Sequence, residues 1–340
     1  MNSRIISRIK TPTRDNIATH LDGFLLPADR HAPSAALTLE NNHFSFTARS
    51  VKSTDKRRIE KGTPCQDATF GVVRNGYLLA GVADGFYKHG HVYSERIAKK
   101  LIEHDFTNEV SENESGKNTS LDDILQSAVK TAIDVFLSEI SAERQIGTNL
   151  NVDALDAYNN GGTTLTVMIL LPDRRYGIAK IGDSEAYLIS PEGQVRVILE
   201  SPAPPYDEDL DEYLETRNLL NVAVSPYSPM TLSTCGGILN TGELALIASD
   251  GIGKNLNITV NPSKVPICVN GCEDLTTIVR SLGTEAAHLE DISLGVVNII
   301  LERIRTHGEN RMRIPREDGN IDFLVPNDDD ISLAMIGIKD

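Results

Sequence analysis

Four aspartates share one local setting that suits cation chemistry. Asp67, Asp84 and Asp250 each adjoin a short apolar run typical of a buried strand, and Asp329 precedes the last such run. Glycine follows Asp84 and Asp250 directly, and its small size lets a backbone carbonyl or a water approach an ion. Mg²⁺ and Mn²⁺ prefer carboxylate oxygens, and a strand holds each carboxylate rigidly. The four residues are therefore candidate metal ligands.

A pair of such ions would support phosphoester hydrolysis. Two divalent ions roughly 3.5–4 Å apart share a bridging water and lower its pKa, which makes hydroxide available near neutral pH. That hydroxide can attack a phosphorus atom in line. A single Asp-Gly after a strand is more often only a turn. Here the dipeptide ends two similar segments, Gly-Val-Ala-Asp-Gly at residues 81–85 and Ile-Ala-Ser-Asp-Gly at residues 247–251. This recurrence favours a metal site.

Apolar periodicity predicts the elements that must position these residues. Alternating or continuous apolar runs predict strands at residues 44–48, 68–73, 77–82, 163–171, 176–181, 186–189, 195–199, 244–248 and 331–338. Apolar residues at helical spacing predict helices at 94–106, 121–140, 273–282 and 290–306. Two groups of strands, each accompanied by two helices, indicate an α+β fold. We expect a four-layer α-β-β-α sandwich of two antiparallel sheets flanked by helices.

The domain organisation follows from the same patterns. Residues 1–40 lack clear periodicity and are predicted to form a partly ordered N-terminal extension. Residues 41–340 are predicted to form one domain. Within that domain, residues 201–230 are rich in Pro, Asp and Tyr and are expected to be an irregular insertion.

Composition narrows the range of partners. The formal net charge is -15, which argues against nucleic acid and anionic membrane as main partners. The four cysteines show neither a disulfide framework nor zinc-finger spacing, which is typical of a reducing compartment. No apolar run has the length of a signal peptide core or of a spanning helix. A cytoplasmic location is the resulting expectation.

Six short motifs, in the same order, resemble those of the metal-dependent serine/threonine protein phosphatases of type 2C. They lie at residues 64–68, 82–85, 161–164, 181–184, 248–251 and 329–332. The first motif, Pro-Cys-Gln-Asp-Ala, is similar to the first acidic motif in a bacterial branch of that family. The resemblance extends over about residues 44–338 and implies the sandwich fold. It also implies a cytoplasmic signalling enzyme that acts on phosphoserine or phosphothreonine in proteins through a metal-bound hydroxide, together with a partner kinase.

The resemblance also implies roles for the aspartates. Asp84 would bridge two Mn²⁺ or Mg²⁺ ions, with help from the Gly85 carbonyl. Asp250 and Asp329 would hold the first ion, and Asp67 would serve the pair directly or through water. In bacterial members the Gly-Asp-Ser aspartate helps to bind a third ion, and that position is Asp183 here.

The chain departs from the family pattern next to these motifs. Gln66 replaces a usual Glu, Asp330 stands where Asn is common, and Glu185 takes a usual Arg position. Gly62 lies near the place of the phosphate-binding arginine. These changes are expected to affect substrate recognition more than metal binding.

A phosphate dianion still needs a cationic partner besides the metals. Arg58 is the favoured candidate over Lys61, because guanidinium binds phosphate in a bidentate fork that lysine lacks. The alternative is a plain surface turn. His89, just past Asp84, is a candidate acid for the leaving alkoxide, and a solvated loop is the alternative for it.

Three functions fit this sequence. A phosphoprotein phosphatase is favoured by the four aspartates. A catalytically weak regulatory or binding module that keeps the fold is favoured by Gln66, Glu185 and the displaced arginine. A metallohydrolase acting on a small phosphoester is the third.

Overall fold

The structure is a computed structural model of the 340-residue chain. It describes residues 21–26, 29, 31–40, 43–53, 56–74, 76–86, 90–114, 120–146, 161–199, 224, 231–256, 258–260, 266–268, 271–282, 289–308, 312–315, 321–324 and 329–339. The expected insertion at 201–230 therefore lies outside the described residues, apart from Val224, which bridges to Thr163. Among the described residues, no helix combines the length and apolar character that crossing a membrane requires.

Sheet A has six antiparallel strands in the order β1-β4-β5-β8-β9-β12. They are β1 (Leu21–Leu26), β4 (Ala68–Arg74), β5 (Tyr77–Ala83), β8 (Leu165–Leu170), β9 (Arg175–Ile181) and β12 (Ser233–Ile238). The β4–β5 hairpin turns at Gly76, whose φ of 91° favours glycine. Ala68 pairs with Ala83 across the hairpin, so the residues just outside it, Asp67 and Asp84, lie at the same end of sheet A.

Sheet B also has six antiparallel strands, in the order β11-β10-β13-β18-β3-β2. They are β2 (Ser34–Glu40), β3 (Phe44–Val51), β10 (Glu185–Ile189), β11 (Val195–Val197), β13 (Leu244–Ala248) and β18 (Ile331–Ile338). Ala248 pairs with Leu333, and the Ser249 N–H donates to the Ser332 carbonyl. The start of β18 and the end of β13 therefore meet, which brings Asp250 close to Asp329 and Asp330.

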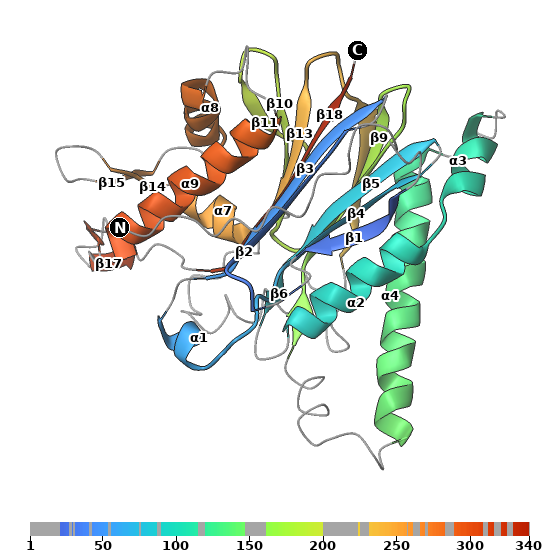
Figure 1. Cartoon of the computed structure of the whole chain (residues 1–340), viewed down its shortest axis with the longest axis horizontal. Coiled ribbons are helices and arrows are strands. Elements are labelled where there is room, and N and C mark those ends of the chain that lie inside the picture. The colour runs from blue at the N-terminus through green and yellow to red at the C-terminus, as the bar shows by residue number, and fades with distance from the viewer. Residues whose placement is uncertain are drawn as a thin grey trace.

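Helices cover the outer face of each sheet (Figure 1). On sheet A lie α2 (Gly90–Glu103) and α4 (Leu121–Ile146), with α3 (Thr107–Glu114) beside α4. On sheet B lie α7 (Asp250–Leu256), α8 (Gly271–Leu282) and α9 (Leu289–Gly308). A short helix, α1 (Lys56–Glu60), follows β3. The remaining strands form three two-stranded pairs: β6 (Gly85–Phe86) with β7 (Gly162–Thr163), β14 (Ile258–Val260) with β15 (Pro266–Cys268), and β16 (Met312–Pro315) with β17 (Ile321–Leu324).

Three apolar clusters separate the four layers. One joins sheet A to α2 and α4, one fills the space between the sheets, and one joins sheet B to α7, α8 and α9. Successive residues of one strand enter different clusters, as Leu78 and Leu79 of β5 do. Fully burying one such side chain contributes about 1.5–3 kcal/mol. The predicted α+β, four-layer sandwich is therefore confirmed.

Two described strands lie within the predicted N-terminal extension. Within the predicted extension, β1 pairs with β4 at the edge of sheet A, and β2 pairs with β3 at the edge of sheet B. Residues 21–40 thus supply an edge strand to each sheet. Strand β1 depends on β4, more than forty residues further along the chain, whereas β2 pairs with the next strand, β3. Helix α2 also begins earlier than predicted, at Gly90, and α4 continues to Ile146.

Candidate metal centre

The strand ends of both sheets bring four candidate ligands together. Asp67 precedes β4 and Asp84 follows β5, while Asp250 opens α7 directly after β13. These three residues are buried, at 1%, 7% and 9% exposure. Asp329 lies two residues before β18, and its side chain is 34% exposed. The centre is therefore a buried acidic cluster with Asp329 at its rim.

Burial and mutual repulsion raise the pKa of two of these carboxylates. Burial raises the pKa of Asp67 well above its usual range, as do the charges of Asp330, Asp329 and Asp250, while a hydrogen bond with Asp84 opposes the rise. Burial likewise raises the pKa of Asp84, and the charges of Asp250, Asp67, Asp329 and Asp183 add to it. Such a cluster favours a cation that neutralises it.

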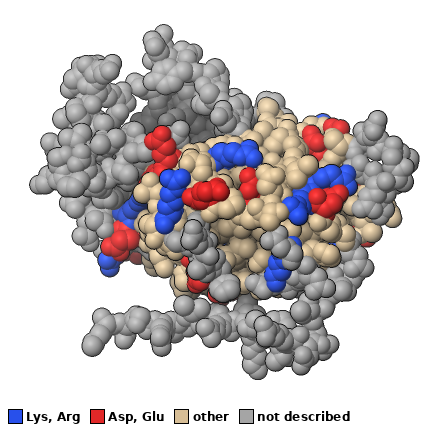
Figure 2. Space-filling model, turned by 90° about the horizontal axis from the view of Figure 1, so that it is seen from above, with Lys and Arg blue, Asp and Glu red and all other residues tan. Residues whose placement is uncertain are grey.

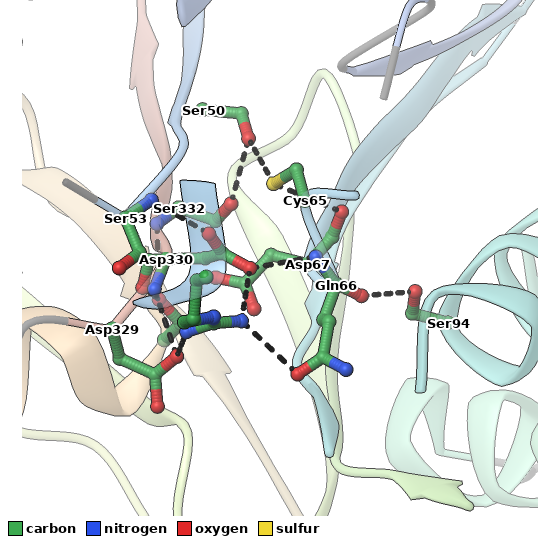
Figure 3. A network of polar contacts seen from close by, with 11 residues as sticks. Ser50, Ser53, Cys65, Gln66, Asp67, Ser94, Asp329, Asp330 and Ser332 are labelled. Atoms are coloured by element: carbon green, nitrogen blue, oxygen red, sulfur yellow. Dashed lines mark hydrogen bonds and ion pairs between the residues drawn. The ribbon is translucent and has the colours of Figure 1, made fainter. Parts of the chain in front are cut away.

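A guanidinium already lies in this cluster. Arg58 of α1 donates from Nη1 to Asp329 Oδ1 at 2.5 Å, and from Nη2 to Asp330 Oδ2 at 3.0 Å and Gln66 Oε1 at 3.1 Å (Figure 3). Burial lowers the pKa of Arg58, but Asp330 and Asp329 outweigh it and raise the pKa above its usual range. In the part of the chain that the structure describes, no three acidic, His or Cys side chains surround a single ion position.

Hydrogen bonds with Thr163 of β7 and with Thr164, which lies between β7 and β8, fix the position of Asp84. The Asp84 N–H donates to Thr164 Oγ1 at 3.2 Å, and Thr163 Oγ1 donates to the Asp84 carbonyl at 3.0 Å. Thr164 Oγ1 also lies 2.6 Å from Ser184 Oγ. All these groups are buried, so the aspartate cannot shift without leaving a polar group unsatisfied.

Thr164→Val is expected to destabilise the fold by about 1–3 kcal/mol, the cost of leaving a buried N–H without its acceptor. Valine keeps the shape of threonine but cannot accept the Asp84 N–H. Urea unfolding of the two proteins measures the difference. Thr131→Val is the matched control, because Thr131 is exposed on α4 and bonds only to the Ser127 carbonyl of its own helix. Equal losses in both variants would contradict the positioning role of Thr164.

Close backbone contacts explain why two positions of the motifs are occupied by glycine. A Cβ on Gly85 would lie 2.4 Å from the Gly90 backbone and 2.5 Å from the Gln66 carbonyl oxygen. A Cβ on Gly251 would lie 2.1 Å from the Asp330 carbonyl oxygen. Glycine therefore lets α2 approach Asp84, and lets the segment before β18 approach Asp250.

The other predicted site residues have different outcomes. Asp183 is partly exposed next to β10, and its charge contributes to the raised pKa of Asp84, which places it at the margin of the cluster. His89 lies outside the described residues, so its suggested role as an acid stays a prediction. Lys61 is exposed after α1 and has no ion pair among the described residues.

Asp330 is the functional candidate that was not predicted from the sequence. It is 1% exposed, and its carboxylate accepts hydrogen bonds from the Ser53 N–H at 2.7 Å and the Gln66 N–H at 2.6 Å. The signal that could have found it is its departure from the usual Asn at that position. Thr164 and Ser184 were likewise seen only as parts of motifs.

The surroundings carry charges of both signs. Figure 2 shows Lys and Arg side chains interspersed with Asp and Glu over the described part of one face, rather than gathered in one basic patch.

Comparisons with known proteins agree on one family. The family model described as protein phosphatase 2C matches residues 54–276, which is more than half of the 340-residue chain. No curated protein sequence matches the chain.

Several solved structures share the fold. The Mycobacterium tuberculosis serine/threonine phosphatase PstP/Ppp has 17% identity and a TM-score of 0.54, with 88% of this chain and 100% of that chain covered. PppA of Pseudomonas aeruginosa has 16% identity and a TM-score of 0.55, over 89% and 100%. The catalytic domain of PstP with two manganese ions has 17% identity and a TM-score of 0.51, over 88% and 99%. The chain belongs to the protein phosphatase 2C family and has the fold of its metal-dependent serine/threonine phosphatases.

Proposed function

We propose that this protein is a metal-dependent phosphatase that hydrolyses phosphoserine and phosphothreonine in proteins. The observation that carries the proposal is the convergence of Asp67, Asp84 and Asp250 in one buried cluster, with Asp329 at its rim. Burying several like charges costs free energy unless a cation binds among them. The crystal structure of PstP with two manganese ions supports Mn²⁺ or Mg²⁺ as that cation.

The proposed ligand set is the one that the family resemblance implies. Asp84 would bridge two ions together with the Gly85 carbonyl, Asp250 and Asp329 would hold the first ion, and Asp67 would serve the pair directly or through water. Asp183, at the margin of the cluster, would contribute to a third ion. When bound, such ions lower the pKa of a shared water and supply a nucleophile near neutral pH.

The other site residues would bind and orient the substrate. Arg58 lies beside Asp329, so its guanidinium is placed to hold a phosphate oxygen in addition to the metals. Thr164 keeps Asp84 fixed while charge develops in the reaction. A partner kinase, a signalling role and a cytoplasmic location complete the proposal, and these rest on the sequence-based expectations alone.

Hydrolysis of p-nitrophenyl phosphate tests the proposed activity. Turnover is expected only with Mn²⁺ or Mg²⁺ and should stop on chelation. A phosphothreonine peptide then separates a protein phosphatase from an enzyme for small phosphoesters, since only the former should turn over the peptide efficiently. No metal-dependent turnover of either substrate, with folding shown by circular dichroism, would contradict the proposal.

A further inference from the structure

The two terminal nitrogens of Arg58 have different partners. Nη2 donates to Asp330 and Gln66, which are 1% and 8% exposed, whereas Nη1 donates to Asp329, whose side chain is 34% exposed. Figure 3 shows Asp330 near the middle of this network and Asp329 at its edge. The contacts of Nη2 are therefore buried, whereas the contact of Nη1 is partly exposed and can be exchanged for another acceptor.

The buried contacts of Asp330 require a carboxylate. Its Oδ1 accepts the Ser53 N–H at 2.7 Å, and its Oδ2 accepts the Gln66 N–H at 2.6 Å and Arg58 Nη2 at 3.0 Å. An asparagine would turn an NH₂ group toward one of these donors and leave it without an acceptor. The surrounding backbone N–H groups thus favour a negatively charged side chain at position 330, and this charge faces Arg58.

Asp329 differs from Asp330, because two cations would compete for its carboxylate. Under the proposed function it is a metal ligand, and its Oδ1 now accepts Arg58 Nη1 and the Asp330 N–H. A divalent ion at this carboxylate would lie close to the guanidinium, where two positive charges repel. Asp330 and Gln66 retain Nη2 in either case, because neither of them is a proposed ligand.

We infer that Asp330 is a positioning residue that anchors Arg58 at the metal centre, and that Asp329 passes from Arg58 to a divalent ion when metal binds. This inference rests on the proposed function. The exchange leaves the Nη1 donors directed into the site, where a phosphate oxygen can accept them. Metal binding therefore creates the phosphate contact, and by linkage the two ligands bind with positive cooperativity.

Calorimetric titration with Mn²⁺ alone tests the exchange. Arg58→Ala should bind Mn²⁺ at least about fivefold more tightly than the unchanged protein, the low end of usual coupling between sites. Lys61→Ala removes the same charge from the same segment but has no ion pair with the cluster in the described structure, so its affinity should stay within about twofold. Equal tightening in both variants, or none in Arg58→Ala, overturns the exchange.

Binding of inorganic phosphate at saturating Mn²⁺ tests the anchor. Asp330→Asn should weaken phosphate binding by roughly tenfold, as loss of a charged hydrogen bond does. The same change made in Arg58→Ala should have little effect, since the anchored group is gone. Equal weakening in both backgrounds would show a merely structural role and overturn the anchor.

A second variant guards against misfolding of Asp330→Asn. Gln66→Met keeps the backbone N–H that Asp330 accepts and removes only the side-chain oxygen that holds Nη2. It should raise KM for p-nitrophenyl phosphate more than it lowers kcat, and it should do neither in the Arg58→Ala background. Absence of Mn²⁺ binding by the unchanged protein would overturn the proposed function itself. Normal Mn²⁺ binding and turnover, without these variant effects, would overturn only the inference.

Discussion

Asp84→Asn is expected to lower the turnover of p-nitrophenyl phosphate at saturating Mn²⁺ by at least about a thousandfold, because a bound metal supplies several kcal/mol of transition-state stabilisation. Burial raises the pKa of Asp84, and the charges of Asp250 and Asp67 add to the rise. Its loss therefore removes the carboxylate that both proposed ions share. Asp250→Asn should have an effect of the same order.

The variant should remain folded. Asparagine has nearly the same volume as aspartate, and removal of one charge relieves repulsion within the metal-free cluster. Steady-state kinetics together with thermal melting followed by circular dichroism measures both effects. Asp173→Asn is the matched control, because it removes a carboxylate from an exposed turn where its partner is Arg175. Wild-type turnover in Asp84→Asn at saturating metal would show that Asp84 is not a metal ligand.

Removal of metal is expected to destabilise the protein, and more so at higher pH. Burial raises the pKa of Asp67 and Asp84 in the folded state, whereas the unfolded value for aspartate is about 3.9. The folded state therefore binds more protons above that value. This contribution to stability is complete below the unfolded pKa and is lost as the pH rises through the folded pKa. Metal-free protein should accordingly become less stable as the pH increases from about 4 toward neutrality.

A bound cation should offset this loss. At a free Mn²⁺ concentration of about 100 times Kd, binding to the native state stabilises it by about 2.7 kcal/mol. Melting temperatures measured at about pH 5 and about pH 8, with Mn²⁺ or with chelator, should show the larger metal effect at the higher pH. Asp67→Asn combined with Asp84→Asn should remove most of the pH dependence of the chelated protein. A melting temperature that neither Mn²⁺ nor pH changes would contradict the convergence of these carboxylates at a metal centre.

Strands buried on both faces were predictable from the sequence. Strands β5, β8 and β13 lie inside their sheets and contact an apolar layer on each side, so they appear as continuous apolar runs with sharp polar ends. Asp84 follows β5 and Asp250 lies just after β13, and for this reason their positions could be inferred together with the strands.

Edge strands were not predictable in the same way. Strand β1 is interrupted by Gly23 at φ 106°, and its pairing with β4 shifts register there. It pairs on one side only, so its sequence need not be apolar throughout. Its stability depends on β4, which lies more than forty residues further along the chain, and no local pattern reports that contact.

The environment of Arg58 depends on contacts that are distant in sequence. Asp329 and Asp330 lie 271 and 272 residues from Arg58 along the chain. The sequence predicted an arginine near the metal centre, because Arg58 lies nine residues before Asp67 on a turn that was expected to approach the metal site. It could not predict that Asp330 would anchor one nitrogen while Asp329 holds the other, since that division depends on the relative burial of two adjacent carboxylates.

The two edge strands from residues 21–40 have a consequence for aggregation. Because β1 closes sheet A and β2 closes sheet B, detachment of this one segment would expose the hydrogen-bonding edges of β4 and β3 together. Each of these strands carries buried phenylalanine, at Phe70 and Phe46. Open edges with apolar side chains are templates for pairing between molecules. Residues 21–40 thus cover one edge of each sheet, and loss of the whole segment would expose both edges at once.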